Sequence, residues 1–245
     1  MKFEKRSAMP VSAQDLFDWH GRPGAFGRLA PPWQTMEILR EDPGLAEGKQ
    51  IELKMDTPVG ARRWHARHTH CEEGRGFTDV QEKGPFKSWT HRHVFEPTGE
   101  SECEMLDSIK YELPLGGLGK SVVGQHLEKG FDYRHWIVRR DLELRNSLPN
   151  FRRLKVAIVG GSGFLGSQLR WLLSAQGHEV SVVTRSPGSD SDIRWDPAAG
   201  EIELARLEGL DAVVHLAGAN LTSGRWTEER KKLLWTSRVD ATEFL

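Results

Sequence analysis

The sequence is poor in the features that mark several classes of protein. Its two cysteines, Cys71 and Cys103, are too few for a small secreted scaffold held by disulfides, and we expect both thiols to be reduced. No apolar run reaches the length of a signal-peptide core or of a bilayer span. From these absences we expect a cytoplasmic protein without a membrane partner.

An excess of charge of one sign is also missing. The chain carries 34 Lys and Arg against 35 Asp and Glu, a net charge of -1, which argues against nucleic-acid binding through bulk charge. In contrast, 38% of the residues are apolar or aromatic, with nine Trp and ten Phe among them. This proportion is too high for a disordered chain and indicates a folded core.

The length of 245 residues allows one large domain or two modest ones. A short charged stretch with Ser147, Pro149 and Asn150 has the composition of a linker. Strand-like segments precede it, whereas a strand, a glycine loop, a helix and another strand follow it. We therefore predict two domains, residues 1–148 and residues 153–245.

The first domain opens with a strand and a helix. Residues 2–10 predict the strand, and Ser12 is a suitable N-cap for a short helix that buries Leu16 and Trp19. Extended segments separated by turn residues come next, and they cover 34–40, 49–55, 62–71, 76–82, 86–95 and 102–113.

A long amphipathic helix is predicted at the end of the first domain. The strand pattern is broken by Pro114, Gly116, Gly117 and Gly119. Apolar residues then recur at mostly helical spacing, at Val123, Leu127, Phe131, Val138 and Leu142. We expect this helix to pack on the concave side of the sheet.

A curved antiparallel sheet that grips one long C-terminal helix is the helix-grip architecture. The stretches FTDVQEKGPFKSWTHRHVFEP, YELPLGGLG and FDYRHW resemble the SRPBCC domain, which is START-like and of the polyketide cyclase type. The resemblance covers most of residues 1–145, and such domains are found ahead of certain short-chain dehydrogenase-like proteins. It implies an α+β helix-grip (START-like) fold and a small apolar ligand held between sheet and helix.

Histidines cluster in this domain. They lie on two extended segments, as His65, His68 and His70 on one and His91 and His93 on the other. Strand alternation predicts that Trp64, Ala66, His68 and His70 share one face, and that Trp89, His91, His93 and Phe95 share another. Two such strands could supply metal ligands if they were adjacent, but no Asp or Glu with ligand-like spacing accompanies them. We therefore expect wall or surface residues and no metal.

The second domain begins with a glycine loop in the context of a dinucleotide site. An apolar strand, residues 155–159, runs into GGSGFLG and then into a helix. Gly160 permits a tight turn, Gly163 lets the backbone approach a pyrophosphate, and Gly166 lets helix and strand pack closely. A second strand over 179–184 follows, so the pattern indicates a βαβ unit rather than an isolated glycine motif.

The end of the second strand bears on the form of the cofactor. An acidic side chain there would bind the 2′-hydroxyl of an adenosine ribose, but the chain has Thr184 and Arg185. A guanidinium favours a 2′-phosphate, so we expect NADP in preference to NAD. A solvated loop arginine is the competing interpretation of Arg185.

Further motifs follow in order: RWDP, DAVVHLAGANL and GRWTEERKKLLWTSRV. With GGSGFLGSQL and VVTR they resemble the NAD-dependent epimerase/dehydratase superfamily of extended short-chain dehydrogenases, in the subgroup of nucleoside-diphosphate-sugar epimerase type. The resemblance spans residues 154–245 and implies a partial α/β Rossmann domain. It places Gly160, Gly163, Phe164, Leu165, Gly166, Thr184, Arg185, Leu216, Ala217 and Gly218 at the dinucleotide.

Enzymes of that superfamily use a Tyr and a Lys four residues later for proton transfer. The chain has two tyrosines; Leu115 follows Tyr111 at that spacing and Ile137 follows Tyr133. Residues 225–245 predict one helix that runs to the last residue, and we expect an incomplete dehydrogenase domain with an exposed edge strand and reduced stability. We assign no catalytic residue.

Two functions are consistent with these patterns. One is an NAD(P)-dependent epimerase-like or oxidoreductase-like protein that has the cofactor-binding half and lacks the catalytic half. The other is an apolar-ligand binding protein that acts through the first domain, with the Rossmann segment as a remnant or an interaction surface.

Overall fold

The computed structural model describes residues 1–57, 60–114, 119–148 and 150–245. The chain divides into two compact units, Met1–Phe151 and Arg152–Leu245. Three of the predicted breaker and linker residues, Gly116, Gly117 and Pro149, lie outside the described residues. No helix among the described residues has both the length and the apolar character needed to cross a membrane.

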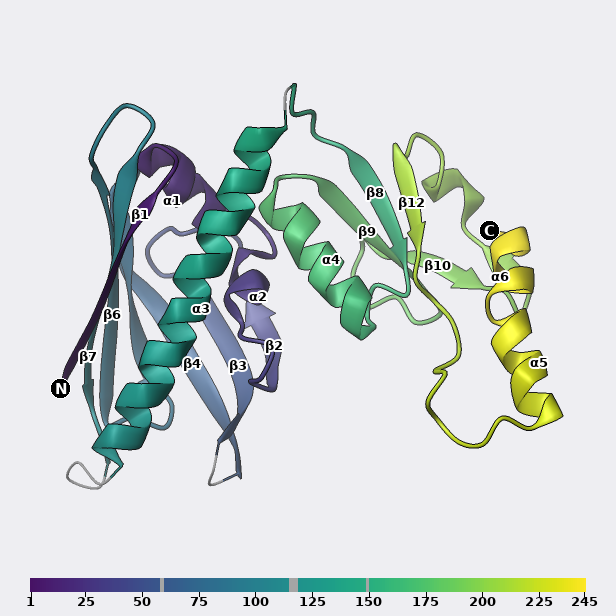
Figure 1. Ribbon diagram of the computed structural model, residues 1–245, viewed down its shortest axis with the longest axis horizontal. Coiled ribbons are helices and arrows are strands. Elements are labelled where there is room, and N and C mark those ends of the chain that lie inside the picture. The colour runs from purple at the N-terminus through teal and green to yellow at the C-terminus, as the bar shows by residue number, and fades with distance from the viewer. Residues whose placement is uncertain (58–59, 115–118, 149) are drawn as a thin grey trace. The chain divides into compact units, whose positions relative to one another are not determined.

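The first unit is built on a seven-stranded antiparallel sheet in the order β1-β7-β6-β5-β4-β3-β2. Its strands are β1 (Lys2–Met9), β2 (Met36–Glu41), β3 (Gln50–Thr57), β4 (Gly60–Glu72), β5 (Gly76–Lys83), β6 (Ser88–Pro97) and β7 (Cys103–Glu112). The long helix α3 (Lys120–Ser147) runs across one face of this sheet, as Figure 1 shows. The predicted helix-grip fold is therefore confirmed.

Two short helices precede β2. Helix α1 (Ala13–Gly21) begins where expected, because the Ser12 hydroxyl accepts a hydrogen bond from the Asp15 amide at 3.1 Å. Helix α2 (Ala25–Leu29) was not predicted from the sequence. Arg28 on α2 donates two hydrogen bonds to the buried Asp141 carboxylate, at 2.9 and 2.6 Å, and so ties α2 to α3.

Alternation along β6 places Trp89, His91, His93 and Phe95 on one face, as predicted, and all four are buried. The prediction for β4 was wrong at one residue. A register irregularity between His68 and His70 shifts the strand, so His68 lines the interior cavity whereas His70 is exposed beside Glu47. Moreover, β4 and β6 are not neighbours, because β5 lies between them.

The second unit contains a five-stranded sheet in the order β11-β10-β9-β8-β12. Its strands are β8 (Lys155–Val159), β9 (Glu179–Thr184), β10 (Ile193–Asp196), β11 (Glu201–Ile202) and β12 (Ala212–His215). All neighbours are parallel except β10 and β11. Helix α4 (Phe164–Ala175) connects β8 to β9 (Figure 1). Strand β12 lies at one end of the strand order.

The last predicted helix is in fact two helices. Thr227 caps α5 (Glu228–Thr236) as expected, but α6 (Val239–Phe244) is separate. The break coincides with contacts to the loop after β12: the Ser237 hydroxyl accepts from the Ala219 amide at 3.0 Å, and Arg238 donates to the Ala219 carbonyl at 3.2 Å. The expectation of one unbroken helix was therefore wrong.

Candidate functional site

The glycine loop of the second unit is shaped by close backbone contacts. Gly160 follows β8 with φ at +81°, a conformation that favours glycine. A Cβ atom on Gly160 would lie 2.8 Å from the Ala217 amide nitrogen, and one on Gly166 would lie 2.2 Å from the Gly160 carbonyl oxygen. Side chains at these two positions would therefore push α4 and the loop after β12 away from β8.

The loop lies at the point where the strand order of the sheet reverses. Strands β9 and β12 flank β8 on opposite sides, and the loops after β8 and β12 therefore meet at the carboxyl ends of the strands. The Leu216 amide donates to the Val159 carbonyl at 2.9 Å, which fixes the two loops together. In open α/β sheets, ligands bind in the crevice at such a reversal.

The N-terminus of α4 faces this crevice without a side-chain cap. Gly163 is its N-cap and makes no side-chain hydrogen bond, and its amide donates to the Gly160 carbonyl at 3.0 Å. Helix N-termini carry partial positive charge and free amides, which suit a phosphate. The next two side chains, Phe164 and Leu165, are 75% and 66% exposed, so apolar surface borders the helix end.

The remaining residues predicted to hold the dinucleotide fall near the same edge of the sheet. Thr184 ends β9, and the exposed Arg185 comes directly after it. Leu216, Ala217 and Gly218 follow β12. Gly218 also has a packing role, since a Cβ atom there would lie 2.9 Å from the guanidinium carbon of Arg238.

The first unit encloses a cavity of about 560 Å³ between its sheet and its helices. Its apolar walls come from sheet and helix alike and include Leu53, Trp64, Ala66, Phe77, Trp89, Leu127 and Phe131. A cavity of this size suits a small organic molecule. Charged or titratable side chains also line it: His20, Arg22, Glu41, Asp42, Lys49, Asp56, His68, Asp79, His91, His93, His126 and Arg134.

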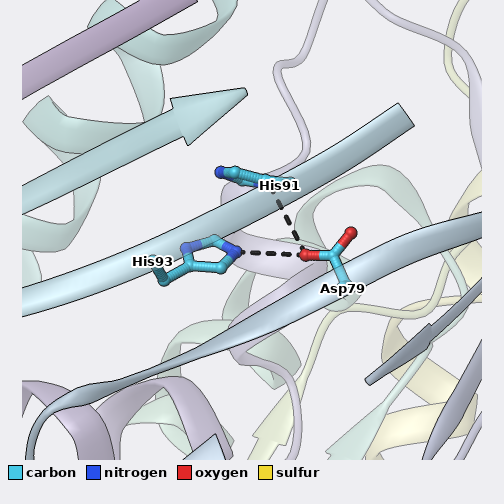
Figure 2. Close-up of side chains that lie close together, drawn as sticks. All are labelled: Asp79, His91 and His93. Atoms are coloured by element: carbon cyan, nitrogen blue, oxygen red, sulfur yellow. Dashed lines mark ion pairs between the residues drawn. The ribbon is translucent and has the colours of Figure 1, made fainter. Parts of the chain in front are cut away.

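Asp79 on β5 and two histidines on β6, His91 and His93, form a polar cluster in this wall (Figure 2). The Asp79 Oδ2 atom lies 3.5 Å from His91 Nδ1 and 3.3 Å from His93 Nε2. The ladder between β5 and β6 explains this placement, because it pairs Asp79 directly with His91. All three side chains therefore converge on one place in the cavity wall.

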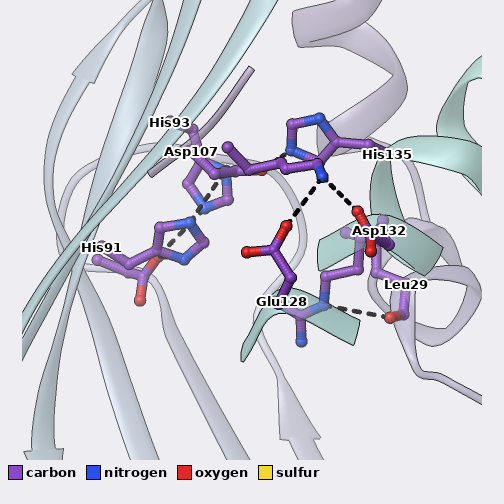
Figure 3. Close-up of polar contacts among 10 residues, drawn as sticks. Leu29, His91, His93, Asp107, Glu128, Asp132 and His135 are labelled. Atoms are coloured by element: carbon purple, nitrogen blue, oxygen red, sulfur yellow. Dashed lines mark hydrogen bonds and ion pairs between the residues drawn. The ribbon is translucent and has the colours of Figure 1, made fainter. Parts of the chain in front are cut away.

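A second carboxylate, Asp107 on β7, lies behind the two histidines. It is 1% exposed, and its Oδ1 atom lies 2.8 Å from His91 Nε2 and 2.7 Å from His93 Nδ1. Its Oδ2 atom lies 2.8 Å from Nε2 of His135 on α3. Three imidazoles thus surround Asp107, as Figure 3 shows, and one of them joins the sheet to the helix.

Charges in this cluster shift the pKa values of its members. Burial alone would lower the pKa of His93, but the Asp107 and Asp79 carboxylates outweigh it and raise that pKa to about 9. Burial would raise the pKa of Asp107, yet the surrounding histidines hold it well below its ordinary value. Burial and the neighbouring His93 lower the pKa of His91, although Asp107 and Asp79 act in the opposite direction.

Sequence reasoning missed both carboxylates and His135. It searched for acidic residues beside the histidines along the chain, whereas Asp79 and Asp107 lie beside them across the sheet. The register of β5, β6 and β7 was needed to find them. In α3, His135 lies four residues after Phe131 on the buried face, a spacing that could have marked it.

Comparison with known proteins identifies a family for each unit. Residues 9–131 match the family described as polyketide cyclase / dehydrase and lipid transport. Residues 156–245 match the NAD dependent epimerase/dehydratase family. The first matched range contains Asp79, His91, His93 and Asp107, and the second contains the glycine loop.

Individual relatives are similar over part of this chain. An epimerase family protein of Mycobacterium leprae is 40% identical over 95 residues, which are 38% of this chain and 31% of that protein. An epimerase family protein of Homo sapiens is 40% identical over 94 residues, 38% of this chain and 30% of that protein. The chain thus spans about a third of the length of these relatives.

A solved structure resembles both units. The crystal structure of a nucleoside-diphosphate sugar epimerase from Corynebacterium glutamicum is 29% identical, with a TM-score of 0.77. The likeness covers 99% of this chain and 50% of that one.

Proposed function

From the premise that the chain belongs to the polyketide cyclase/dehydrase and lipid transport family and carries an NAD-dependent epimerase/dehydratase segment, we propose that its second unit binds NADP(H). The observation that supports this most is the glycine loop at the reversal of the sheet, where side chains on Gly160 or Gly166 would clash with backbone. Such a loop lets the backbone approach a pyrophosphate closely.

The proposed binding residues have different roles at the dinucleotide. Gly163, Phe164 and Leu165 present the first amides of α4 to the pyrophosphate. Gly160 and Gly166 keep the loop, β8 and α4 close together, and Leu216, Ala217 and Gly218 border the crevice from β12. When bound, the nicotinamide supplies hydride transfer, which epimerase-type oxidoreductases use. We assign cofactor binding, and not turnover, to the residues of this chain.

The preference for NADP depends on Arg185. Its guanidinium follows β9, is exposed, and occupies the place where NAD-binding proteins have a carboxylate. A charge-assisted hydrogen bond to the 2′-phosphate contributes about 1.5–3 kcal/mol. We expect Arg185→Ala to weaken NADPH binding about 10-fold to 100-fold and to leave NADH binding unchanged, measured by isothermal titration calorimetry on the full chain.

The matched control is Arg152→Ala. Arg152 pairs with Asp211 at 2.9 Å, and both residues lie before their strands, at the edge of the sheet opposite the crevice. This variant should bind NADPH as the wild type does. Equal affinity of the wild type for NADH and NADPH would contradict the assigned preference, and no binding of either would contradict the proposed function.

The cavity of the first unit favours a second function, the binding of a small apolar molecule. Its volume of about 560 Å³ and its aromatic walls support this. We expect Ala66→Phe to weaken the binding of an apolar fluorescent probe such as 1-anilinonaphthalene-8-sulfonate by roughly 10-fold, because the buried Ala66 lines the cavity and the added ring would occupy it.

The control for this variant lies on the same strand. Ala61 is exposed on β4, so Ala61→Phe adds the same ring outside the cavity and should leave probe binding unchanged. Fluorescence titration of both variants checks the assignment. If the two variants bind the probe equally, the cavity is not its site.

A further inference from the structure

We propose that Asp79, His91 and His93 form a binding site for a divalent transition-metal ion, with Zn²⁺ as the best match. The three side chains come from the neighbouring strands β5 and β6 and line the cavity of the first unit. Each offers one ligand atom, and these atoms all lie within 4.8 Å of one another. Two imidazoles and a carboxylate are ligands that Zn²⁺ and Fe²⁺ commonly take in proteins.

The distances within the group fit a shared ion better than direct hydrogen bonds. Asp79 Oδ2 lies 3.5 Å from His91 Nδ1 and 3.3 Å from His93 Nε2 (Figure 2). Good N–H···O bonds are shorter, near 2.9 Å. With bonds of 2.0–2.1 Å to Zn²⁺, two ligands of a tetrahedron are about 3.3 Å apart. The two distances from Asp79 are therefore already close to the coordinated spacing.

The second nitrogen of each histidine is oriented by Asp107. In His91, Nδ1 faces Asp79, and Nε2 lies 2.8 Å from Asp107 Oδ1. In His93, Nε2 faces Asp79, and Nδ1 lies 2.7 Å from Asp107 Oδ1. Metal-binding histidines almost always have their other ring nitrogen on a carboxylate, a carbonyl or water, which fixes the tautomer and the ring. Asp107 is in that position for both rings at once.

The charges around the site also favour a cation. Asp79 and Asp107 place two buried or nearly buried carboxylates within reach of the same two histidines. The cationic side chains Arg22, Lys49 and Arg134 also line the cavity. Burying carboxylates is costly unless a cation compensates them.

The position of the site indicates what the ion would do. Three protein ligands leave at least one coordination position open, and the ligands line a cavity with apolar walls. A ligand with an apolar body and one carbonyl or hydroxyl oxygen would fit both features, with its oxygen on the metal. The metal site itself does not depend on the proposed binding of an apolar probe.

The test uses the full chain without an affinity tag, stripped with EDTA, dialysed, and titrated with Zn²⁺ by calorimetry. The wild type should bind one equivalent, and Co²⁺ in its place should give the visible absorption of a four-coordinate site. We expect Asp79→Asn to weaken Zn²⁺ binding by more than the roughly 100-fold that loss of an outer-shell partner can cost. His70→Gln, which removes an exposed histidine of β4, should leave the affinity unchanged.

Thermal unfolding of each variant in EDTA is the control for correct folding. Asp79→Asn should keep a cooperative transition. If it does not, anomalous diffraction at the zinc edge from wild-type crystals locates the ion without any variant. An ion between Asp79, His91 and His93 supports the proposal. Failure to bind one equivalent, an affinity unchanged in Asp79→Asn, or an ion found elsewhere overturns it.

Discussion

Gly166→Ala is expected to weaken NADPH binding by the full chain at least about 100-fold. The added Cβ atom would lie 2.2 Å from the Gly160 carbonyl oxygen and 2.7 Å from the Gly161 Cα atom. Both neighbours are backbone, so α4 must move away from the loop that Gly160 and Gly163 form. We expect the affinity to fall at least about 100-fold, and the free energy of unfolding to fall by about 1–3 kcal/mol from overpacking.

Calorimetric titration with NADPH and urea unfolding measure these two effects. Gly124→Ala is the matched control, because Gly124 lies inside α3 and a Cβ atom there meets nothing within 4 Å. This control should bind NADPH normally and gain up to about 1 kcal/mol of stability from its better helix propensity. A Gly166→Ala protein that binds NADPH as tightly as the wild type would show that the loop does not hold the dinucleotide.

Asp107→Ala is expected to have the largest effect on the stability of the first unit. The Asp107 carboxylate lies within 2.8 Å of a nitrogen on each of His91, His93 and His135. Removing it leaves these buried nitrogens without their acceptor and leaves the positive charge on His93 less compensated. Breaking a buried ion pair in this way costs about 3–5 kcal/mol. Urea unfolding in EDTA measures this cost without a contribution from metal.

The control for this variant is Asp132→Ala, which removes an exposed carboxylate that pairs with Lys5. Exposed pairs contribute about 1 kcal/mol or less, so the two aspartates should differ clearly. The low pKa of Asp107 adds a pH criterion. Its stabilisation is present above the ordinary Asp pKa of about 3.9 and is lost only as the pH falls through its lower folded-state pKa. Equal losses for both variants would contradict the role of the cluster.

Local patterns were sufficient to predict most of the elements. The apolar run before Gly160 and the run that ends at Thr184 predicted β8 and β9 at their observed bounds. Ser12 and Thr227 marked the starts of α1 and α5, because a cap acts through its own backbone neighbours. Features of this kind depend on residues close in the chain.

The misses came from contacts between distant residues. The break between α5 and α6 coincides with hydrogen bonds from Ser237 and Arg238 to the loop after β12, and no local signal marks it. The displacement of His70 from the cavity face follows from an irregularity in the pairing of β4 with β5. Both depend on how segments meet in three dimensions.

The two candidate sites also differ in whether their residues are close in the chain or only in space. The proposed dinucleotide residues lie in short segments whose glycine spacing is itself the signal, so the sequence alone is enough to propose them as a set. The polar cluster beside the cavity of the first unit joins Asp79, His91, Asp107 and His135 from three strands and a helix. Only the sheet register and the helix position bring these side chains together.

The central claim, that the second unit binds a dinucleotide at its glycine loop, is tested most directly by amide NMR spectra of the full chain during titration with NADPH. We predict saturable shifts concentrated at Gly160, Gly163 and Gly166, at Arg185, and in the loop that holds Ala217. Arg185→Ala should reduce the shift at its own position and in its neighbours more than those in the glycine loop. Spectra that do not change, or shifts confined to the first unit, would contradict the account.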